Sequence, residues 1–481
     1  MNINVGPLIH LLPEQRWFGS KDRALQNIEV RDHAIIEGAH DGGESLVLAL
    51  LDVHFVDGLV AIYQMPLLVN QDGDVRDALD DAGRLNVFGR ALARGETFKG
   101  ERGAFRFGGP GLDPLAPPGH GSVRAMGAEQ SNSSIVLDDS VILKLIRRVE
   151  EGDNPELELN RFLTNEGFEY IPAQVGEIFY EEEHPEGEVG VNIDLGIAQQ
   201  YVSDATEGWS EALKHVAALY DGISGDEDVA TRRRQVDALV ATLLEELAAL
   251  GDVTAGLHVL LGRGQEHDPE IGRESATHQD LRDWAMHARH TLSSLPTDRI
   301  PELTDEVIGS VNARLDAIES IVEPGAKTRI HGDYHLGQTL LGPRGWLILD
   351  FEGEPLRSLE ERRALQSPLR DVAGMLRSFS YAAYSALLER AEPDSERWNQ
   401  LEPWVETFEE LARHYFLQAY LRTSHEGDLL PHDRDELGTL LDFFELDKAL
   451  YEVGYELGHR PDWVRIPLRG ILDVVNRGGT R

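Results

Sequence analysis

One polar segment, Thr328–Pro355, constrains this chain more than any other part of its sequence. It reads TRIHGDYHLGQTLLGPRGWLILDFEGEP, with the turn-forming run Gly342–Gly345 between two apolar stretches. A turn of this kind between apolar runs predicts a β-hairpin. Asp333 and Gln338 come before the hairpin and Asp350 comes after it. The segment is therefore expected to bring two carboxylates and an amide into one small volume.

Phosphoryl transfer by kinases needs this arrangement. A loop Asp accepts the proton of the acceptor hydroxyl, an amide five residues later holds a metal ion, and a second Asp binds that ion beside the phosphates. Asp333, Gln338 and Asp350 stand at the matching offsets, with Gln in place of the usual Asn. Asp residues also cap ordinary turns, but three ligand-type residues in this order favour a catalytic loop.

Length, charge and cysteine content narrow the choice of partners. The chain has 481 residues, enough for two or three domains, and its 45 basic and 85 acidic residues give a formal charge of −40. Such a surface repels nucleic acid and anionic lipid. The absence of cysteine excludes disulfides, thiolate zinc sites and cysteine nucleophiles. With neither a signal-peptide pattern nor an apolar run near ~20 residues, we expect a cytoplasmic protein without nucleic-acid or membrane partners.

The order of apolar patterns predicts an α+β fold in three parts. Residues 1–104 show strand-like runs and then helical periodicity over 74–94, which ends at Gly95. Residues 105–204 begin with a Gly- and Pro-rich stretch and continue with further strand signals. Residues 205–481 are mainly helical in pattern. We therefore expect an N-terminal cap, a strand-rich intermediate subdomain and a helical C-terminal part.

Lys144 is a candidate phosphate-binding residue. It lies on a predicted strand, and Asn154-Pro155 then predicts the start of a helix that carries Glu156 and Glu158. Kinases hold nucleotide phosphates with a strand lysine that an acidic helix residue keeps in place. We expect Glu158 to anchor Lys144, with Glu156 as the alternative. A lysine that protects an edge strand from aggregation is the competing interpretation.

Two further stretches are candidates for nucleotide contacts. Ser131, Asn132 and Ser133 lie where a phosphate-binding lid would be expected, although this loop lacks the usual glycines. Hydroxyl, amide and backbone N–H groups also bind phosphate oxygens, and a plain polar hairpin loop is the alternative. Gln200 and Val202 come just before the helical part, where a lobe hinge and an adenine slot would fall.

The C-terminal helices offer candidate sugar contacts. Lys448 and Tyr451 combine a polar group with an aromatic face, which suits a sugar, although such a helical stripe more often belongs to a core. Glu352 beside the hairpin end is a third candidate for contact with the substrate. Three arginines, Arg357, Arg362 and Arg363, could brace the metal-binding loop through its carboxylates Glu352 and Glu354, or each could belong to an ordinary charged surface. His258, on a helical stretch, is more typical of a packed histidine than of a ligand.

These residues together resemble the bacterial maltokinases, a group of aminoglycoside-phosphotransferase-like kinases. The resemblance is carried by HGDYHLGQ (331–338), ILDFEGEP (348–355) and SPLRDVAGMLRSFSYAA (367–383), and it continues in ELDKALYEVGYELGHRPDWVRIPL (445–468). RWFGSKDR (16–23) is similar to the N-terminal cap of the same family.

The resemblance implies a bilobal protein-kinase-like fold, in which the cap and the intermediate subdomain form one lobe and the helices form the other. It implies ATP- and Mg²⁺-dependent phosphorylation of maltose to maltose 1-phosphate, on the route from trehalose to α-glucans such as glycogen. It also allows an association with trehalose synthase. Asp333 would be the catalytic base, Gln338 and Asp350 the Mg²⁺ ligands, and Lys144 a phosphate contact.

Three alternatives stay open at this point. A glucosamine kinase of the same fold is the nearest, and an aminoglycoside kinase is another. A catalytically inactive relative acting as a regulatory module would be expected to lose Asp333, Gln338, Asp350 or Lys144, and the chain retains all four.

Overall fold

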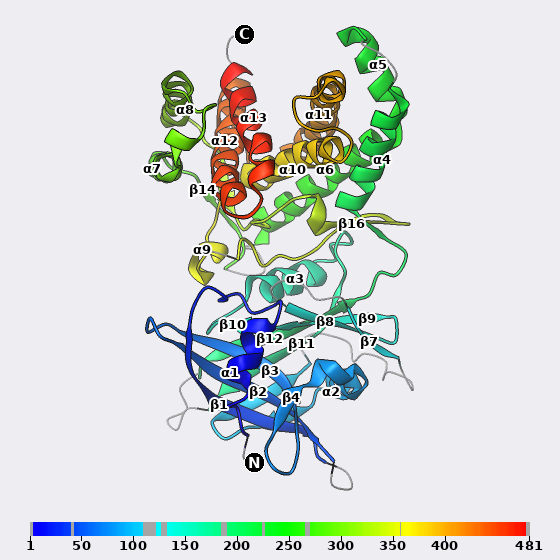
Figure 1. Cartoon of the computed structure of the whole chain (residues 1–481), viewed down its shortest axis with the longest axis vertical. Coiled ribbons are helices and arrows are strands. Elements are labelled where there is room, and N and C mark those ends of the chain that lie inside the picture. Colours follow the sequence, from blue (N-terminus) through cyan, green and yellow to red (C-terminus); the bar gives the residue numbers. More distant parts are fainter. Residues whose placement is uncertain are drawn as a thin grey trace. The chain divides into compact units, whose positions relative to one another are not determined.

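The computed structural model describes residues 3–39, 43–108, 122–126, 132–183, 190–223, 227–264, 270–355 and 357–477. The chain forms two compact units, residues 1–203 and residues 204–481. Strands dominate the first unit and helices the second (Figure 1). This confirms the α+β prediction, while the division of the first unit near residue 104 stays a prediction. No described helix is both long and apolar enough to cross a membrane.

The first unit contains a sheet that is buried on both faces. Its long antiparallel strands are β1 (Leu25–Glu37), β2 (Ser45–Phe55) and β3 (Val60–Val69), joined by the short β4 (Val75–Asp77) and β10 (Arg148–Val149). Neighbouring residues of β2 point to opposite faces, so Leu48 enters one core and Val47 the other. Trp17 and Phe18 of the N-terminal segment cover the second face. Burial on both faces explains why β2 is an almost unbroken apolar run.

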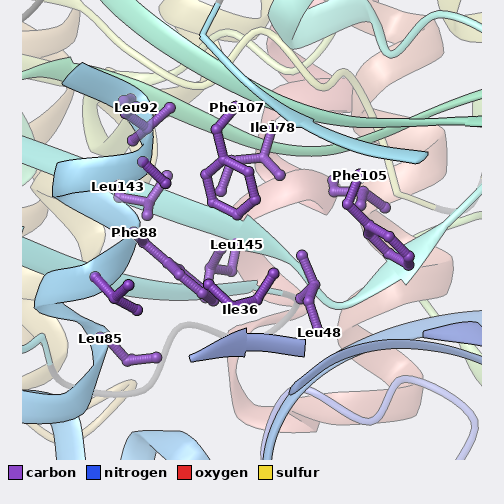
Figure 2. Close-up of a cluster of buried hydrophobic side chains, with 14 of the residues drawn as sticks. Ile36, Leu48, Leu85, Phe88, Leu92, Phe105, Phe107, Leu143, Leu145 and Ile178 are labelled. Carbon is purple, nitrogen blue, oxygen red and sulfur yellow. The ribbon is translucent and has the colours of Figure 1, made fainter. Parts of the chain in front are cut away.

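A second sheet of the same unit encloses the larger core. Its strands, in spatial order, are β5 (Thr97–Lys99), β6 (Gly103–Phe107), β11 (Gln174–Glu182), β12 (Asn192–Gln200), β9 (Val141–Ile146), β8 (Asn132–Leu137) and β7 (Val123–Ala125). Figure 2 shows Leu143 and Leu145 of this sheet gathered with Ile36 and Leu48 of the first sheet and with Phe88. Phe88 belongs to helix α2 (Asn86–Arg94), so this helix packs into the core that the two sheets share.

The helix predicted over residues 74–94 is wrong in its first half. Residues 75–77 form β4, and the Asp77 side chain then accepts a hydrogen bond from the Leu79 N–H and starts a 3₁₀ segment, Ala78–Leu85. Asp81 leaves helical geometry within that segment, at φ −132° and ψ 65°. The α-helix therefore begins only at Asn86, and it ends as predicted at Gly95, whose φ of 62° favours glycine.

The second unit is built around one buried helix, α10 (Leu369–Leu388). Its other main helices are α4 (Gly208–Gly222), α5 (Val229–Leu239), α6 (Ala241–Gly262), α7 (His278–Ser294), α8 (Asp305–Ala317), α9 (Leu359–Arg363), α11 (Glu396–Ser424), α12 (Arg434–His459) and α13 (Arg465–Asn476). Helix α10 packs against α4, α11, α12 and α13 (Figure 1). A Cβ at Gly374 of α10 would lie 2.6 Å from the Tyr334 carbonyl oxygen, so glycine lets the loop that contains Tyr334 reach this helix.

The predicted hairpin is confirmed. Strands β16 (Thr339–Gly342) and β17 (Gly345–Ile348) pair in antiparallel fashion, with Gly345 at a φ of 105° in the turn. Strand β13 (Thr206–Glu207) extends this small sheet, and β15 (Ala326–Thr328) pairs with β14 (Arg273–Ser275) just before the polar loop. The polar loop is thus held between two short ladders of backbone hydrogen bonds.

Candidate active site

Asp371 organises the loop at residues 329–338, which is called the Asp333 loop below. Its buried carboxylate accepts hydrogen bonds from the backbone N–H groups of His331 (2.7 Å) and Gly332 (2.9 Å). Burial would raise the pKa of Asp371, but the hydrogen bond and the charge of His258 outweigh it and lower that pKa below its ordinary value. His258 lies 3.1 Å from Asp371 and 2.9 Å from the Tyr420 hydroxyl, which confirms that it is a packed histidine.

His331 links the Asp333 loop to the end of the hairpin. Its Nε2 lies 2.7 Å from the Leu349 carbonyl oxygen, and its Nδ1 lies 3.3 Å from the Asp333 backbone nitrogen. In these contacts Nε2–H donates to the carbonyl oxygen and Nδ1 accepts from the backbone N–H. The ring also packs against Tyr334 and Phe351, with centroids 5.1 and 5.0 Å away. The position of Asp333 therefore depends on a histidine two residues before it.

Gln338 and Asp350 meet, as the spacing predicts. The Gln338 amide nitrogen donates a hydrogen bond to Asp350 Oδ2 at 3.0 Å. The atom of the Gln338 side chain that could coordinate a cation is then its carbonyl oxygen. Asp350 has a φ of 63°, a conformation that non-glycine residues rarely adopt and that is typical of functional sites. An amide and a carboxylate oxygen are hard ligands of the type that Mg²⁺ prefers. The residues present therefore fit the expected ion.

Two glycines let the Asp333 loop and the hairpin end approach closely. Gly332 and Gly353 have φ values of 84° and 73°, and a Cβ on Gly332 would lie 3.2 Å from the Gly353 Cα. Because neither residue carries a side chain, the two backbones can pass next to each other at this point.

A chain of opposite charges continues from Asp333 to Arg357. Lys448 Nζ lies 3.6 Å from Asp333 Oδ1 and donates to Glu354 Oε1 at 2.8 Å, and Arg357 Nε donates to Glu354 Oε2 at 2.6 Å. Burial would raise the pKa of Glu354, but Lys448 and Arg357 lower it to about 2. Burial would lower the pKa of Lys448, but Glu354 and Asp333 raise it above its ordinary value. Arg357 thus braces Glu354, as the sequence analysis suggested.

The candidate sugar contacts lie around this charge chain. The Tyr451 ring lies 5.2 Å from Lys448 Nζ and stacks on Tyr455 at 6.5 Å, and Tyr455 stacks on His459 at 4.4 Å. Tyr455 is exposed, so the row is accessible. Glu352 is half-buried and belongs to the hairpin end. The structure gathers Lys448 with Asp333, while the roles of Lys448, Tyr451 and Glu352 toward a sugar stay predictions.

The sequence analysis missed a polar network that follows Lys448 along α12. Arg377 of α10 donates to Glu452 at 2.9 Å, and the Tyr381 hydroxyl donates to Glu456 at 3.1 Å. Arg460 donates to Glu456 at 2.6 Å. The signal that could have revealed the network is the four-residue spacing of residues 448, 452, 456 and 460, which places them on one helix face.

In the first unit, Lys144 of β9 forms an ion pair with Glu156. The distance from Lys144 Nζ to Glu156 Oε2 is 2.8 Å, and only 11% and 2% of the two side chains are exposed. Helix α3 (Pro155–Asn165) begins where Asn154 accepts the Glu156 N–H at 2.9 Å. Glu158 comes two positions later on the helix, so its side chain points about 200° away from that of Glu156. The residue that pairs with Lys144 is therefore Glu156, the second choice of the sequence analysis, and not Glu158.

The stretch predicted to form a phosphate-binding loop is already a strand at Asn132 and Ser133. Both are buried residues of β8, because this strand stays paired with β9 as far as Asn132 and Ile146. The Ser133 hydroxyl accepts a hydrogen bond of 2.8 Å from Arg147, a fully buried cation. Ser131 lies outside the described residues. Phosphate contacts by these residues stay predictions.

Gln200 and Val202 lie at the end of the first unit. Gln200 is the exposed last residue of β12, and its backbone N–H donates to Ala173 at 2.9 Å. Val202 is half-buried just beyond the strand. Their contact with an adenine ring stays a prediction.

Two family models match this chain. The model of the phosphotransferase enzyme family matches residues 122–427, and the model of the maltokinase N-terminal cap domain matches residues 11–87. The glucosamine kinase of Mycolicibacterium smegmatis is 28% identical over 369 residues, which cover 74% of this chain and 80% of that protein. The glucosamine kinase of Streptacidiphilus jiangxiensis is 25% identical over 360 residues, 73% of each chain.

Solved structures share the fold. A glucosamine kinase in complex with glucosamine, ADP and inorganic phosphate has a TM-score of 0.65 at 22% identity and covers 98% of this chain and 100% of its own. A second crystal form of a glucosamine kinase has a TM-score of 0.66 at 22% identity, over 96% and 97% of the two chains. This likeness confirms the predicted kinase-like fold.

Proposed function

Since this chain belongs to the phosphotransferase enzyme family, we propose that it is an ATP-dependent kinase that phosphorylates a sugar hydroxyl. The observation that carries the proposal is the 3.0 Å contact between Gln338 and Asp350, next to the loop that presents Asp333. Two ligands suited to Mg²⁺ and a candidate base thus come from one 28-residue segment. The names of the curated relatives support a sugar as the acceptor.

Asp333 would act as the base. Its carboxylate would orient the acceptor hydroxyl and take its proton as the hydroxyl oxygen bonds to the γ-phosphorus. Lys448, 3.6 Å away, holds this carboxylate in place and offsets its charge. Lys448 also donates a hydrogen bond to Glu354, so its ammonium group is shared between two carboxylates. Most of the catalysis would come from positioning and electrostatics.

Gln338 and Asp350 would hold Mg²⁺, and Lys144, fixed by Glu156, would bind phosphate oxygens of ATP. When bound, Mg²⁺ would neutralise part of the phosphate charge during transfer. The overall charge of −40 makes such local cations necessary, because ATP is itself an anion. Use of ATP also favours the cytoplasm as the place of action.

We propose maltose as the acceptor and maltose 1-phosphate as the product. The match of residues 11–87 to the maltokinase cap supports this choice. The aromatic side chains of Tyr451, Tyr455 and His459 lie next to one another on α12, and aromatic side chains are common partners of sugars. The product would serve α-glucan synthesis from trehalose, and association with trehalose synthase belongs to the same proposal.

Glucosamine is the second candidate, favoured by the names of the curated relatives. Its ammonium group would need a carboxylate partner. Near Lys448, the carboxylates Glu354, Glu452 and Glu456 already pair with lysine or arginine side chains. The positive charge of Lys448 would also repel an ammonium group at short range. These charges make maltose the first choice.

ADP release measured with maltose, glucosamine, glucose and kanamycin in parallel tests the acceptor. We expect rapid release with maltose and little with the other three. Activity on glucosamine with none on maltose would replace the proposed acceptor but keep the kinase. Absence of release with all four sugars, from protein that binds ATP, would contradict the proposed sugar kinase.

A further inference from the structure

Three side chains of metal-binding type meet in the second unit, outside the residues assigned above. Glu211 and His215 lie one turn apart on α4, and Glu246 lies on α6. One potential ligand atom from each residue lies within 4.8 Å of the other two. Residues four positions apart share one helix face, so α4 presents a carboxylate and an imidazole together. We propose that these three residues bind a divalent transition-metal ion of the Zn²⁺ class.

Glu246 supplies the observation that calls for a ligand. Its Oε2 is buried and has no hydrogen-bond partner among the residues that the structure describes. A buried acceptor without a partner destabilises the fold, and a cation at this oxygen would remove that cost.

The other two ligands are already close together. His215 Nε2 lies 3.0 Å from Glu211 Oε1, so the two groups are at ligand–ligand distance. The same oxygen accepts from Lys214 Nζ at 2.8 Å. The Lys214 side chain is 69% exposed, and such a surface ion pair contributes little to stability. A metal ion can therefore replace this contact at small cost.

The donor set distinguishes this site from the Gln338–Asp350 pair. An imidazole nitrogen and two carboxylates suit Zn²⁺, Co²⁺ or Mn²⁺, with water completing the coordination. Mg²⁺ prefers oxygen ligands, as Gln338 and Asp350 offer. The two sites should therefore take different ions from a mixture.

Both ligand-bearing helices contact the support of the Asp333 loop. Trp346 Nε1 donates to the backbone carbonyl of Glu246 at 2.7 Å. At the start of α4, a Cβ on Gly208 would lie 2.9 Å from the Trp346 ring and 2.8 Å from the Leu336 carbonyl oxygen. An ion that ties α4 to α6 would thus stiffen the packing around Trp346 and Leu336, and through them the end of the Asp333 loop.

Titration of the full-length, ATP-free protein with Co²⁺ and then Zn²⁺ tests the site, with millimolar Mg²⁺ present to occupy the acidic surface. We expect one equivalent of Co²⁺ with a visible absorption band typical of nitrogen and oxygen ligands, displaced by one equivalent of Zn²⁺. His215→Ala and Glu246→Gln should each weaken the affinity at least tenfold. Because no phosphoryl transfer is measured, the result is independent of the proposed kinase activity.

Two matched variants separate this site from others. Asp350→Asn removes the expected Mg²⁺ ligand, and His290→Ala removes an exposed histidine of α7. Both variants should still bind one equivalent of Co²⁺ with the wild-type affinity. Equal affinity in wild type and His215→Ala would overturn the proposal, as would a wild-type protein without the Co²⁺ band. Where one of His215→Ala and Glu246→Gln fails to fold, the other tests the same site, because the two variants change different ligands.

Discussion

Asp371 Oδ2 accepts a hydrogen bond of 2.7 Å from the backbone N–H of His331, across 40 residues of sequence. The same carboxylate holds Gly332 and faces His258, so one buried charge joins α6, α10 and the Asp333 loop. The base proposed at Asp333 is therefore positioned by a residue that does not itself belong to the loop.

Asp371→Asn should reduce both stability and turnover. The variant keeps the volume but loses the charge that accepts two backbone N–H groups, so we expect a loss of about 2 kcal/mol in the free energy of unfolding. Turnover should fall at least tenfold because Asp333 loses its alignment. Urea unfolding and ADP release measure the two effects. Asp283→Asn, at an exposed position of α7, serves as the control and should change neither stability nor turnover. Wild-type stability and turnover in Asp371→Asn would refute the positioning role of Asp371.

Asp333→Asn should abolish most of the activity while ATP still binds. Loss of a general base typically costs a factor of 10² to 10⁴, and the ATP contacts proposed for Lys144 lie elsewhere in the chain. ADP release measures turnover, and calorimetric titration with ATP measures binding. Near-normal turnover in this variant would remove the assignment of Asp333 as the base.

Glu354 should contribute stability at neutral pH that is lost in acid. Its pKa is lowered to about 2 in the folded protein, so the contribution is complete above the ordinary value near 4.5 and disappears as the pH falls toward 2. Between pH 6 and pH 3 the wild type should lose roughly 2 kcal/mol more than Glu354→Gln. Urea unfolding of both proteins across this range gives the difference. Parallel curves for the two proteins would show that Lys448 and Arg357 do not stabilise the ionised carboxylate.

Lys448→Met should reduce kcat/KM for the sugar by tenfold or more, with little change in the KM for ATP. The change leaves Glu354 paired with Arg357 but removes the cation beside Asp333. Steady-state kinetics with each substrate varied in turn separates the two effects. Lys327→Met removes another half-buried lysine, paired with Asp280, and provides the comparison. Equal effects of the two substitutions would indicate a structural role for Lys448 only.

Local pattern was sufficient to predict much of this protein. The hairpin at β16 and β17, the strand that carries Lys144 and the helix start at Asn154-Pro155 follow from turn residues, alternation and capping, which act over a few residues. The pairing of Gln338 with Asp350 also follows, because a short hairpin necessarily returns the chain to its starting point. Residues 74–94 show the limit of helical periodicity as a predictor. Asp77 caps a 3₁₀ segment there, and Asp81 leaves helical geometry within that segment, so the expected helix is divided.

Contacts between distant segments were decided only by the tertiary structure. Lys448 lies 94 residues from Glu354 in the sequence yet donates to it at 2.8 Å, and Asp371 holds a loop 40 residues earlier. The choice of Glu156 over Glu158 depended on the rotation of α3 relative to β9, which helical spacing alone does not specify. Sequence spacing determines which groups one element presents together. Only packing determines which elements face each other, because burial of apolar surface is not directional.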